Sequence, residues 1–222
     1  MKTRILLSVF SLQLSAFLLP LFAASGPSWW VTQNVISSNA TADDFAVVNQ
    51  GQLKHIATQA AAELNSHLPM GAGSDIMNMV VAWQTPVAKT DNYAVVNLGQ
   101  LKTVAKPFYD RLMAIGYANA YPWNANQQGV DNYALANIGQ VKYLFSFDVA
   151  LDSDIDDLPD WWELKWFGTL NENANNSHMG DGLSNWLKYL LGLNPLKAAT
   201  QDTANTTLQL NVHTPAAFDT IP

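Results

Sequence analysis

The sequence predicts a mainly α protein, built from three short helical repeat units, a pair of loop–helix units and a C-terminal β-strand. Three observations support this fold class. One pattern occurs three times before residue 150, each copy opens with a helix-start signal, and an acidic stretch then leads into the first of two short aromatic segments. Residues 25–150 are therefore a helical repeat domain, residues 151–195 a loop–helix segment, and residues 196–222 a linker and the start of a truncated β domain.

Residues 1–24 have the layout of a secretory signal peptide. Lys2 and Arg4 precede an apolar run over residues 5–22, and the small residues 23–26 follow it. A basic start, an apolar centre and a small-residue cleavage region define such peptides, and this run is short for a membrane span. An uncleaved membrane anchor is the alternative. We expect a secreted chain, extracellular, on the cell surface or periplasmic, with no membrane span after signal removal.

The composition narrows the classes of partner. The formal net charge of -7 disfavours nucleic acid and anionic membrane surfaces, because both attract basic faces. The chain has no cysteine, so no disulfide stabilises it, and a core or a metal ion must do so. Seven of the eighteen acidic residues lie between Asp148 and Glu163, and such a cluster repels itself unless a cation or solvent neutralises it. The expected partner is an unknown protein or surface polymer.

The repeated pattern begins with Asp, then has Asn or Asp at the second position and an aromatic residue at the third. Ala, two aliphatic or small residues, Asn, any residue, Gly, Gln, an aliphatic residue and Lys follow. Its copies begin at Asp43, Asp91 and Asp131. An Asn followed three residues later by Gln indicates a helix start, because Asn caps the helix and the Gln side chain reaches back to the N–H of the cap. Helices are therefore predicted to begin at Asn49, Asn97 and Asn137.

Other repeated residues predict how the units pack. The Gly in each first helical turn costs up to ~1 kcal/mol against Ala, so its recurrence predicts close backbone packing. We expect the aromatic residue of each copy to pack on the neighbouring helix, and the units to stack on one another through extended linkers. Pro107 is expected to kink or divide the second helix. The repeated lysines are expected to be solvated: Lys54, Lys102 and Lys142.

Five aromatic residues of the repeat domain allow two interpretations. They form a sugar-stacking surface, or they fill the interfaces between units. Because repeat units bury their apolar faces against their neighbours, we favour the second interpretation. The residues are Trp29, Trp30, Trp83, Tyr121 and Trp123.

The stretch DSDIDDLPDWWELKW, residues 152–166, has the ligand spacing of a 12-residue calcium loop of the EF-hand type. Such a loop uses side-chain oxygens at positions one, three, five and nine, a backbone carbonyl at seven and a bidentate Glu at twelve. Those positions hold Asp152, Asp154, Asp156, Asp160, Leu158 and Glu163, respectively. The chain offers no thiolate here, so zinc and copper are poorly served. The sequence therefore predicts calcium.

Two residues of this loop depart from the usual calcium-loop sequence. Position six is normally a Gly with positive φ, but here it is Asp157, which enters that region at some cost, and Pro159 removes one N–H. We expect the ~0.1–1 mM affinity of extracellular modules. The alternative is a helix start alone, with Asp160 as N-cap, Glu163 as its capping-box partner and Gly168 as the helix end. A capping box, however, does not need acids at alternate positions upstream.

A second loop–helix unit follows over residues 177–195. Its positions one, three, nine and twelve hold Ser177, Met179, Asn185 and Lys188. Because most charged ligands are gone, we interpret it as a degenerate site that keeps the scaffold without the metal. Ser184 is expected to cap its helix and Gly192 to end it. The indoles of both units are expected to fill the contact between the two helices: Trp161, Trp162, Trp166 and Trp186.

The segments DSDIDDLPDWWELKWFGTL and GDGLSNWLKYLLGLNP resemble bacterial thrombospondin type 3-like calcium repeats. Those repeats commonly read Asp-x-Asp-Gly-Asp-Gly-Leu, followed by a short helix and a Gly-x-Asn/Asp-Pro end. The NYAVVNLGQLK copies resemble repeats found beside such segments in large secreted bacterial surface proteins. The resemblance covers about residues 29–195 and implies calcium-dependent rigidity. Its implied ligands are Asp152, Asp154, Asp156, Asp160 and Glu163.

The C-terminal residues predict a linker and a strand. Residues 196–206 are polar and small, and Leu208, Leu210 and Val212 then alternate with polar residues, as in a strand. A lone strand cannot hold itself. We therefore expect the chain to be the N-terminal part of a longer surface protein.

The function predicted from these features is a secreted or cell-surface calcium-binding structural or adhesion module that is not an enzyme. A dockerin-like docking module that tethers a partner protein is the alternative, and it needs an exposed helix face repeated in both units. A hydrolase ranks below both, because it needs two carboxylates ~5–10 Å apart across a cleft. The acids of this chain lie in one local loop instead.

Overall fold

The computed structural model describes residues 26–35, 44–123 and 131–199, and it confirms a mainly helical fold. The predicted signal peptide, residues 1–24, and the predicted strand, residues 208–213, lie outside these ranges. Among the described residues, no helix has the length and apolar character needed to cross a membrane.

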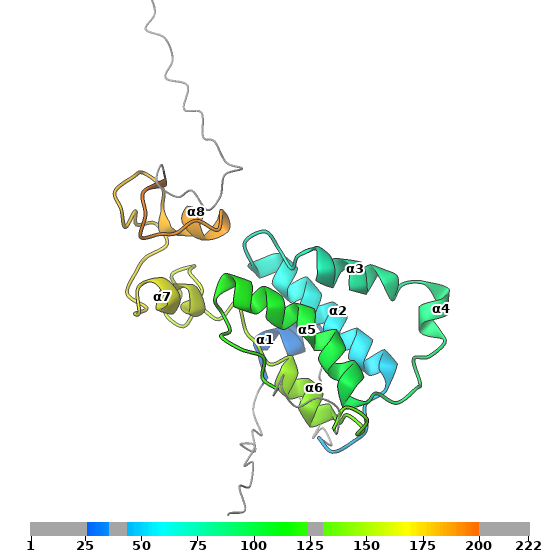
Figure 1. The fold of residues 1–222 in the computed structure, drawn as a ribbon. Helices are drawn as coiled ribbons and strands as arrows, with labels where there is room; N and C mark the ends of the chain where they lie inside the picture. The colour runs from blue at the N-terminus through cyan, green and yellow to red at the C-terminus, as the bar shows by residue number, and fades with distance from the viewer. Residues whose placement is uncertain (1–25, 36–43, 124–130, 200–222) are drawn as a thin grey trace, which may run out of the picture.

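The described chain contains eight helices, in two groups. They are α1 (Ser28–Thr32), α2 (Gln50–His67), α3 (Ser74–Ala82), α4 (Pro86–Lys89), α5 (Leu98–Ile115), α6 (Ile138–Leu144), α7 (Asp160–Trp166) and α8 (Asn185–Leu190). The long helices α2 and α5 contact each other, and both contact α3. Figure 1 shows these helices with α1, α4 and α6 as one body, with α7 and α8 beside it. The repeats thus make the body, and the loop–helix units attach to it.

The three predicted helix starts are confirmed. Helices α2, α5 and α6 each begin directly after an Asn whose side chain accepts from the backbone N–H of the Gln three residues on. That Gln side chain in turn accepts from the N–H of the Asn, which completes a capping box. The capping residues are Asn49, Asn97 and Asn137. Helix α5 continues through Pro107, so this proline does not divide the second helix, and the kink expected as the other outcome stays a prediction.

The three repeats close into a ring instead of stacking in a row. The N–H of Val48 donates to Ala136 O (3.0 Å), that of Ala136 to Val96 O (2.9 Å), and that of Val96 to Val48 O (3.0 Å). These residues hold the same place in the three copies, and all are buried. Each copy therefore satisfies the backbone of the next, and the third copy completes the ring on the first.

Glycine and lysine hold each junction of this ring together. The N–H of Gly99 donates to Asn132 O at 2.9 Å, and a Cβ on Gly99 would lie 3.3 Å from that oxygen. Lys102 Nζ lies 3.0 Å from Asn132 Oδ1. The other two junctions repeat this arrangement, with Lys54 bonded to Asn92 and Lys142 to Asp44. The close packing predicted from the glycines is confirmed. The prediction of solvated lysines is wrong, because these side chains are half-buried links between copies.

The aromatic residue of each repeat points outward. Phe45, Tyr93 and Tyr133 are 86, 92 and 84% exposed. The residue that faces inward just before each helix is instead the buried aliphatic residue that makes the backbone hydrogen bonds between copies, such as Val96. The prediction that these aromatics pack on a neighbouring helix is therefore wrong.

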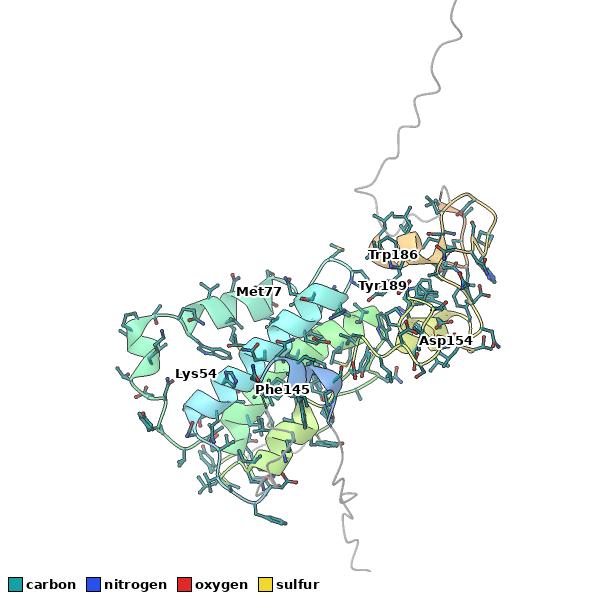
Figure 2. The ribbon with its side chains drawn as sticks, turned by 180° about the vertical axis from the view of Figure 1, so that it is seen from behind. Lys54, Met77, Phe145, Asp154, Trp186 and Tyr189 are labelled. Atoms are coloured by element: carbon teal, nitrogen blue, oxygen red, sulfur yellow. The ribbon has the colours of Figure 1, made fainter. Side chains whose placement is uncertain are left out.

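The tryptophans near the N-terminus belong to the core, as we favoured. Trp29 and Trp30 are buried, and their indole N–H groups donate to Phe147 O (2.8 Å) and Phe145 O (3.0 Å). Trp83 and Trp123 pack against the same core. Helix α1 is thereby fixed to the segment that follows α6, and Figure 2 shows Phe145 of that segment within the helical body. This segment leads directly into the acidic loop.

Candidate metal centre

The acidic loop is fixed at both of its ends. The N–H of Asp160 donates to Leu151 O (2.8 Å), and the indole N–H of Trp161 donates to Val149 O (3.0 Å). Val149 is part of the main core. Helix α7 starts at the end of the loop, and Figure 2 shows Asp154 in the loop beside that helix. The loop is therefore held between the body and α7.

The structure brings the predicted acids together. Carboxylate oxygens of Asp152, Asp154 and Asp156 lie within 4.8 Å of one another, and so do those of Asp154, Asp160 and Glu163. Five carboxylates thus meet around Asp154, whose pKa is raised by desolvation and by the charge of Asp156. These groups could hold a metal ion. The sixth predicted residue, Leu158, is fully buried, and its N–H donates to Asp156 Oδ1 at 2.8 Å.

The backbone at Asp157 makes the turn that a glycine would make. Its φ is +74°, and that of Ile155 is +61°. Asp152 stabilises this turn, because its Oδ2 accepts from the N–H of Asp157 (2.9 Å) and its Oδ1 from the N–H of Ile155 (2.8 Å). Positive φ is a costly conformation for a β-branched residue such as Ile. The departure from glycine at position six therefore does not prevent the loop from closing.

Asp160 belongs to the loop and does not cap α7. The N-cap of α7 is Pro159, and no side chain caps that helix. Asp160 instead turns back, accepting from Ser153 N (2.7 Å) and Ser153 Oγ (2.6 Å). The interpretation of Asp160 and Glu163 as a capping box alone is therefore wrong.

Glu163 is the least satisfied polar group of the loop. Its side chain is fully buried, and neither carboxylate oxygen has a described partner at good hydrogen-bond geometry, although the backbone of Glu172 lies close enough to lower its pKa. Burial, followed by the charges of Asp156 and Asp154, raises the pKa of Glu163 to about 7. Lys165, the basic residue of the same helix, donates to Ile115 O in the helical body instead. A buried carboxylate without a partner is costly, and a cation among these acids would remove that cost.

The second loop has the same backbone design as the first. Gly180 and Gly182, with φ of +63° and +81°, stand where Ile155 and Asp157 stand in the first loop. Asp181 Oδ1 accepts from Leu183 N (3.1 Å) and its Oδ2 from Ala199 N (2.9 Å). Asp156 accepts from Leu158 N (2.8 Å) and Ala174 N (3.1 Å) at the corresponding positions. The bonds of the second unit therefore reach past residue 195. Ser184 caps α8, as predicted.

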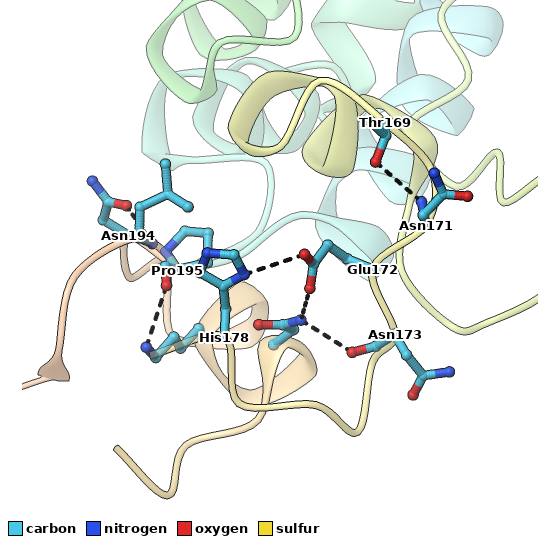
Figure 3. Close-up of polar contacts among 10 residues, drawn as sticks. Thr169, Asn171, Glu172, Asn173, His178, Asn194 and Pro195 are labelled. Atoms are coloured by element: carbon cyan, nitrogen blue, oxygen red, sulfur yellow. Dashed lines mark hydrogen bonds and ion pairs between the residues drawn. The ribbon is translucent and has the colours of Figure 1, made fainter. Parts of the chain in front are cut away.

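The position that Glu163 holds in the first loop is held by Lys188 in the second. Lys188 is fully buried, and its Nζ lies 2.8 Å from Asp181 Oδ2. Lys188 Nζ also donates to Lys197 O (3.0 Å). It reaches Pro195 O at 3.5 Å, and the dashed line at Pro195 in Figure 3 marks this contact. Burial would raise the pKa of Asp181, but Lys188 and two backbone N–H groups lower it far below its ordinary value. The sequence pattern predicted only that Lys188 replaces a metal ligand, although the retained Asp181 indicated an acidic partner for this lysine.

Residues outside the loops complete the second unit. Figure 3 shows Glu172 bonded to His178, with 3.2 Å between Oε1 and Nδ1. The Asn185 amide donates to Glu172 Oε2 (3.3 Å) and to Asn173 O (3.1 Å). Position nine of the second loop, Asn185, is thus bonded to Glu172 and Asn173, whereas Asp160 is bonded within its own loop.

The two units attach to the ends of the long helices. The Tyr189 hydroxyl donates to His67 O at the end of α2, and Trp161 makes edge contacts with Tyr117 and Tyr189 at 6.1 Å. Figure 2 shows Tyr189 at this junction and Trp186 further out. Trp161 therefore joins the units to the body as well as to each other, and Trp162 also contacts Tyr189. The predicted place of Trp186 in this contact is wrong, because its side chain is 43% exposed and lies outside the buried cluster of the two units.

Comparison of the chain with models of protein families, with curated proteins and with solved structures found no match. The chemistry of the two loops therefore rests on their own geometry. That geometry brings together all five acids that the spacing predicted, and it places Lys188 at the position of the second loop that Glu163 holds in the first.

Proposed function

We propose that the chain is a secreted or cell-surface calcium-binding structural module, without enzymatic activity, whose first loop binds one Ca²⁺ ion. The observation that carries this proposal is Glu163, whose two oxygens are buried without a hydrogen-bond partner and of which one lies within 4.8 Å of carboxylate oxygens of Asp154 and Asp160. The proposed ligands are the carboxylates of Asp152, Asp154, Asp156, Asp160 and Glu163, with the carbonyl of Leu158.

The donor set favours calcium over other metals. All of the proposed donors are oxygens, and calcium accepts six to eight of them in flexible geometry, whereas Mg²⁺ demands a near-octahedral arrangement. Asp152, Asp156 and Asp160 already accept loop N–H or hydroxyl groups, but a carboxylate oxygen has a further lone pair for a cation. The nearby His178 is bonded to Glu172. Thiolate and imidazole metals are therefore disfavoured.

The proposed role of the ion is to make the junction between the loops and the helical body rigid. A cation neutralises the acids that hold the start of α7, and α7 contacts the body through Trp161 and Lys165. At ~2 mM free calcium and a dissociation constant of ~0.1 mM, binding adds ~1.8 kcal/mol to the free energy of unfolding. The resemblance to thrombospondin type 3-like repeats supports this role, since it implies calcium-dependent rigidity.

Calorimetric titration of the full chain with Ca²⁺ tests the proposal. We expect one ion per chain with a dissociation constant of ~0.1–1 mM, and weaker binding of Mg²⁺. Asp154→Ala should abolish the binding, whereas the exposed Asp91→Asn, in the repeat ring, should preserve it. Absence of a binding signal at millimolar calcium, or an unchanged signal in Asp154→Ala, would refute the site.

The alternative of a dockerin-like module finds little support. It needs one exposed helix face present in both units. Trp186 of α8 is 43% exposed, whereas the corresponding Trp161 packs against the core of the body. The two helices therefore present different faces.

A second observation favours an adhesive role for the ring of repeats. The junction of the second and third repeats forms a shallow hollow of about 520 Å³, with Tyr133 on its wall. The capping box uses the side-chain oxygens of Asn97 and Gln100, and their amide NH₂ groups carry no hydrogen bond to any described residue. The polar lining is uncharged and consists of Gln50, Asn97, Gln100, Thr103 and Asn132. An exposed aromatic ring beside uncharged amide donors suits a neutral polysaccharide, whose C–H groups stack on the ring and whose hydroxyls accept hydrogen bonds.

Saturation-transfer NMR with neutral hexasaccharides of glucose, mannose and N-acetylglucosamine tests this role. We expect at least one of them to bind, and Tyr133→Ala to abolish the signal. Phe45→Ala is the matched control, because it removes the equivalent exposed ring outside the hollow. Absence of binding by all three sugars, or binding that survives Tyr133→Ala, contradicts the adhesive role and leaves a protein as the partner of this surface.

A further inference from the structure

The two loops have the same hydrogen-bonded frame but opposite charge at position twelve. Asp156 and Asp181 hold position five and accept from equivalent backbone N–H groups. Glu163 and Lys188 hold position twelve, and both side chains are fully buried. A buried carboxylate and a buried ammonium therefore occupy equivalent positions of the two loops.

We propose that the Lys188 ammonium is a resident cation that takes the place, in the second loop, of the metal ion bound by the first. An ammonium has three N–H donors, and Lys188 Nζ lies near three oxygens. These are Asp181 Oδ2 at 2.8 Å, Lys197 O at 3.0 Å and Pro195 O at 3.5 Å. One carboxylate and two carbonyls are the oxygen types that a calcium loop offers its ion.

The charges of the two loops agree with this assignment. The five side-chain ligand positions of the first loop are all acidic. At the same positions the second loop has one acid and one base, so its charge is balanced internally; the other positions hold Ser177, Met179 and Asn185. A divalent ion next to Asp181 would meet the buried ammonium of Lys188 and be repelled. The second loop therefore excludes a metal ion, and the chain binds one ion.

The consequence is that only one of the two units depends on calcium. Lys188 and Asp181 close the second loop with or without the ion, and this loop leads into α8, whose Tyr189 bonds to the helical body. The closed first loop, by contrast, brings five carboxylates together without a resident cation, so we expect it to open more often when calcium is absent. The second unit is thus a permanent attachment and the first a conditional one. The statement about the first unit rests on the proposed function, whereas that about Lys188 does not.

Conversion of the second loop tests the proposal in the full chain. Ser177→Asp and Met179→Asp restore acids at positions one and three, and Lys188→Glu restores the acid at twelve. Calorimetry with Ca²⁺ should give one ion for the wild type, one for the double variant that retains Lys188, and two for the triple variant. Two ions in the wild type or in the double variant would overturn the proposal, and so would one ion in the triple variant if it is folded by circular dichroism.

Hydrogen exchange gives a second readout that does not depend on the variants. Adding about 5 mM calcium should slow the amides of Leu158 and Ala174 by about fiftyfold at a dissociation constant of ~0.1 mM. The equivalent amides of Leu183 and Ala199 should be protected in EDTA and change little. If the wild type binds no ion, the proposed function fails, but protection of Leu183 in EDTA still supports the resident cation. If Leu183 and Ala199 exchange freely in EDTA, Lys188 does not close the loop.

Discussion

Substitution of Glu163 by Gln should change the stability of the protein in opposite directions with and without calcium. The replacement keeps the shape of the side chain and removes its charge. Without the ion, that charge is buried and has no partner, so its removal relieves a cost. With the ion, the same charge is a ligand, so its removal weakens binding.

The expected change without calcium follows from the shifted pKa of Glu163. Its pKa is about 7 in the folded protein and 4.5 in a model peptide. At pH 8 the buried carboxylate is ionised, and at about 1.4 kcal/mol per pKa unit this costs at most ~3.5 kcal/mol. Gln avoids this cost but leaves a buried amide without partners, at ~1–3 kcal/mol. The variant should therefore be about as stable as the wild type, or up to ~2.5 kcal/mol more stable.

The expected change with calcium follows from linkage. At ~2 mM calcium and a dissociation constant of ~0.1 mM, the wild type gains ~1.8 kcal/mol. Loss of the bidentate ligand should raise the dissociation constant at least tenfold, which leaves a gain of ~0.6 kcal/mol or less. Calcium should therefore stabilise the variant by about one third as much as the wild type, or less.

Urea unfolding at pH 8, followed by tryptophan fluorescence in EDTA and in ~2 mM calcium, measures both changes. The exposed Asp91→Asn serves as the control for removal of a negative charge. A calcium gain of wild-type size in Glu163→Gln would refute the ligand role. A loss of more than ~3 kcal/mol in EDTA would refute the claim that the carboxylate is unpaired.

Three further predictions concern pH and the repeat ring. Because the folded pKa of Glu163 lies above its unfolded value, its stabilising contribution is complete below pH 4.5 and is lost as pH rises through about 7. Calcium-free stability relative to Glu163→Gln should fall across that range, and saturating calcium should flatten the curve. Gly99→Ala should lose ~1–3 kcal/mol of unfolding free energy, because the new Cβ meets Asn132 at 3.3 Å; a gain, usual for Gly→Ala in helices, would contradict the close junction. Lys102→Met should lose ~1 kcal/mol in urea unfolding, and the more exposed Lys106→Met less; equal losses would argue against a linking role.

Helix starts were predictable because their determinants are local. Asn97 and Gln100 satisfy each other's backbone across three residues, and the structure shows the same bonds in all three copies. The outward aromatics and the linking lysines were not predictable in this way. They depend on closure of the ring, which pairs Val48 with Ala136 across most of the repeat domain.

In the candidate site, too, the features set by neighbouring residues were predictable, and those set by distant residues were not. The spacing of acids along one loop was enough to predict that they meet, since a single turn brings them together. The spacing left open whether Asp157 would adopt positive φ, a conformation that is stabilised by the hydrogen bond from the Asp157 N–H to the Asp152 carboxylate. It also missed the role of Lys188, because that role needs the chain to fold back so that Lys197 and Ala199 close the second loop.

A crystal structure of the full chain grown with calcium would test the central claim most directly. We predict one ion in the first loop, with both Glu163 oxygens at the ~2.3–2.6 Å typical of calcium ligands. We also predict the Lys188 ammonium, and no ion, beside Asp181. A loop in which the Glu163 oxygens remain without an ion at saturating calcium would contradict the account.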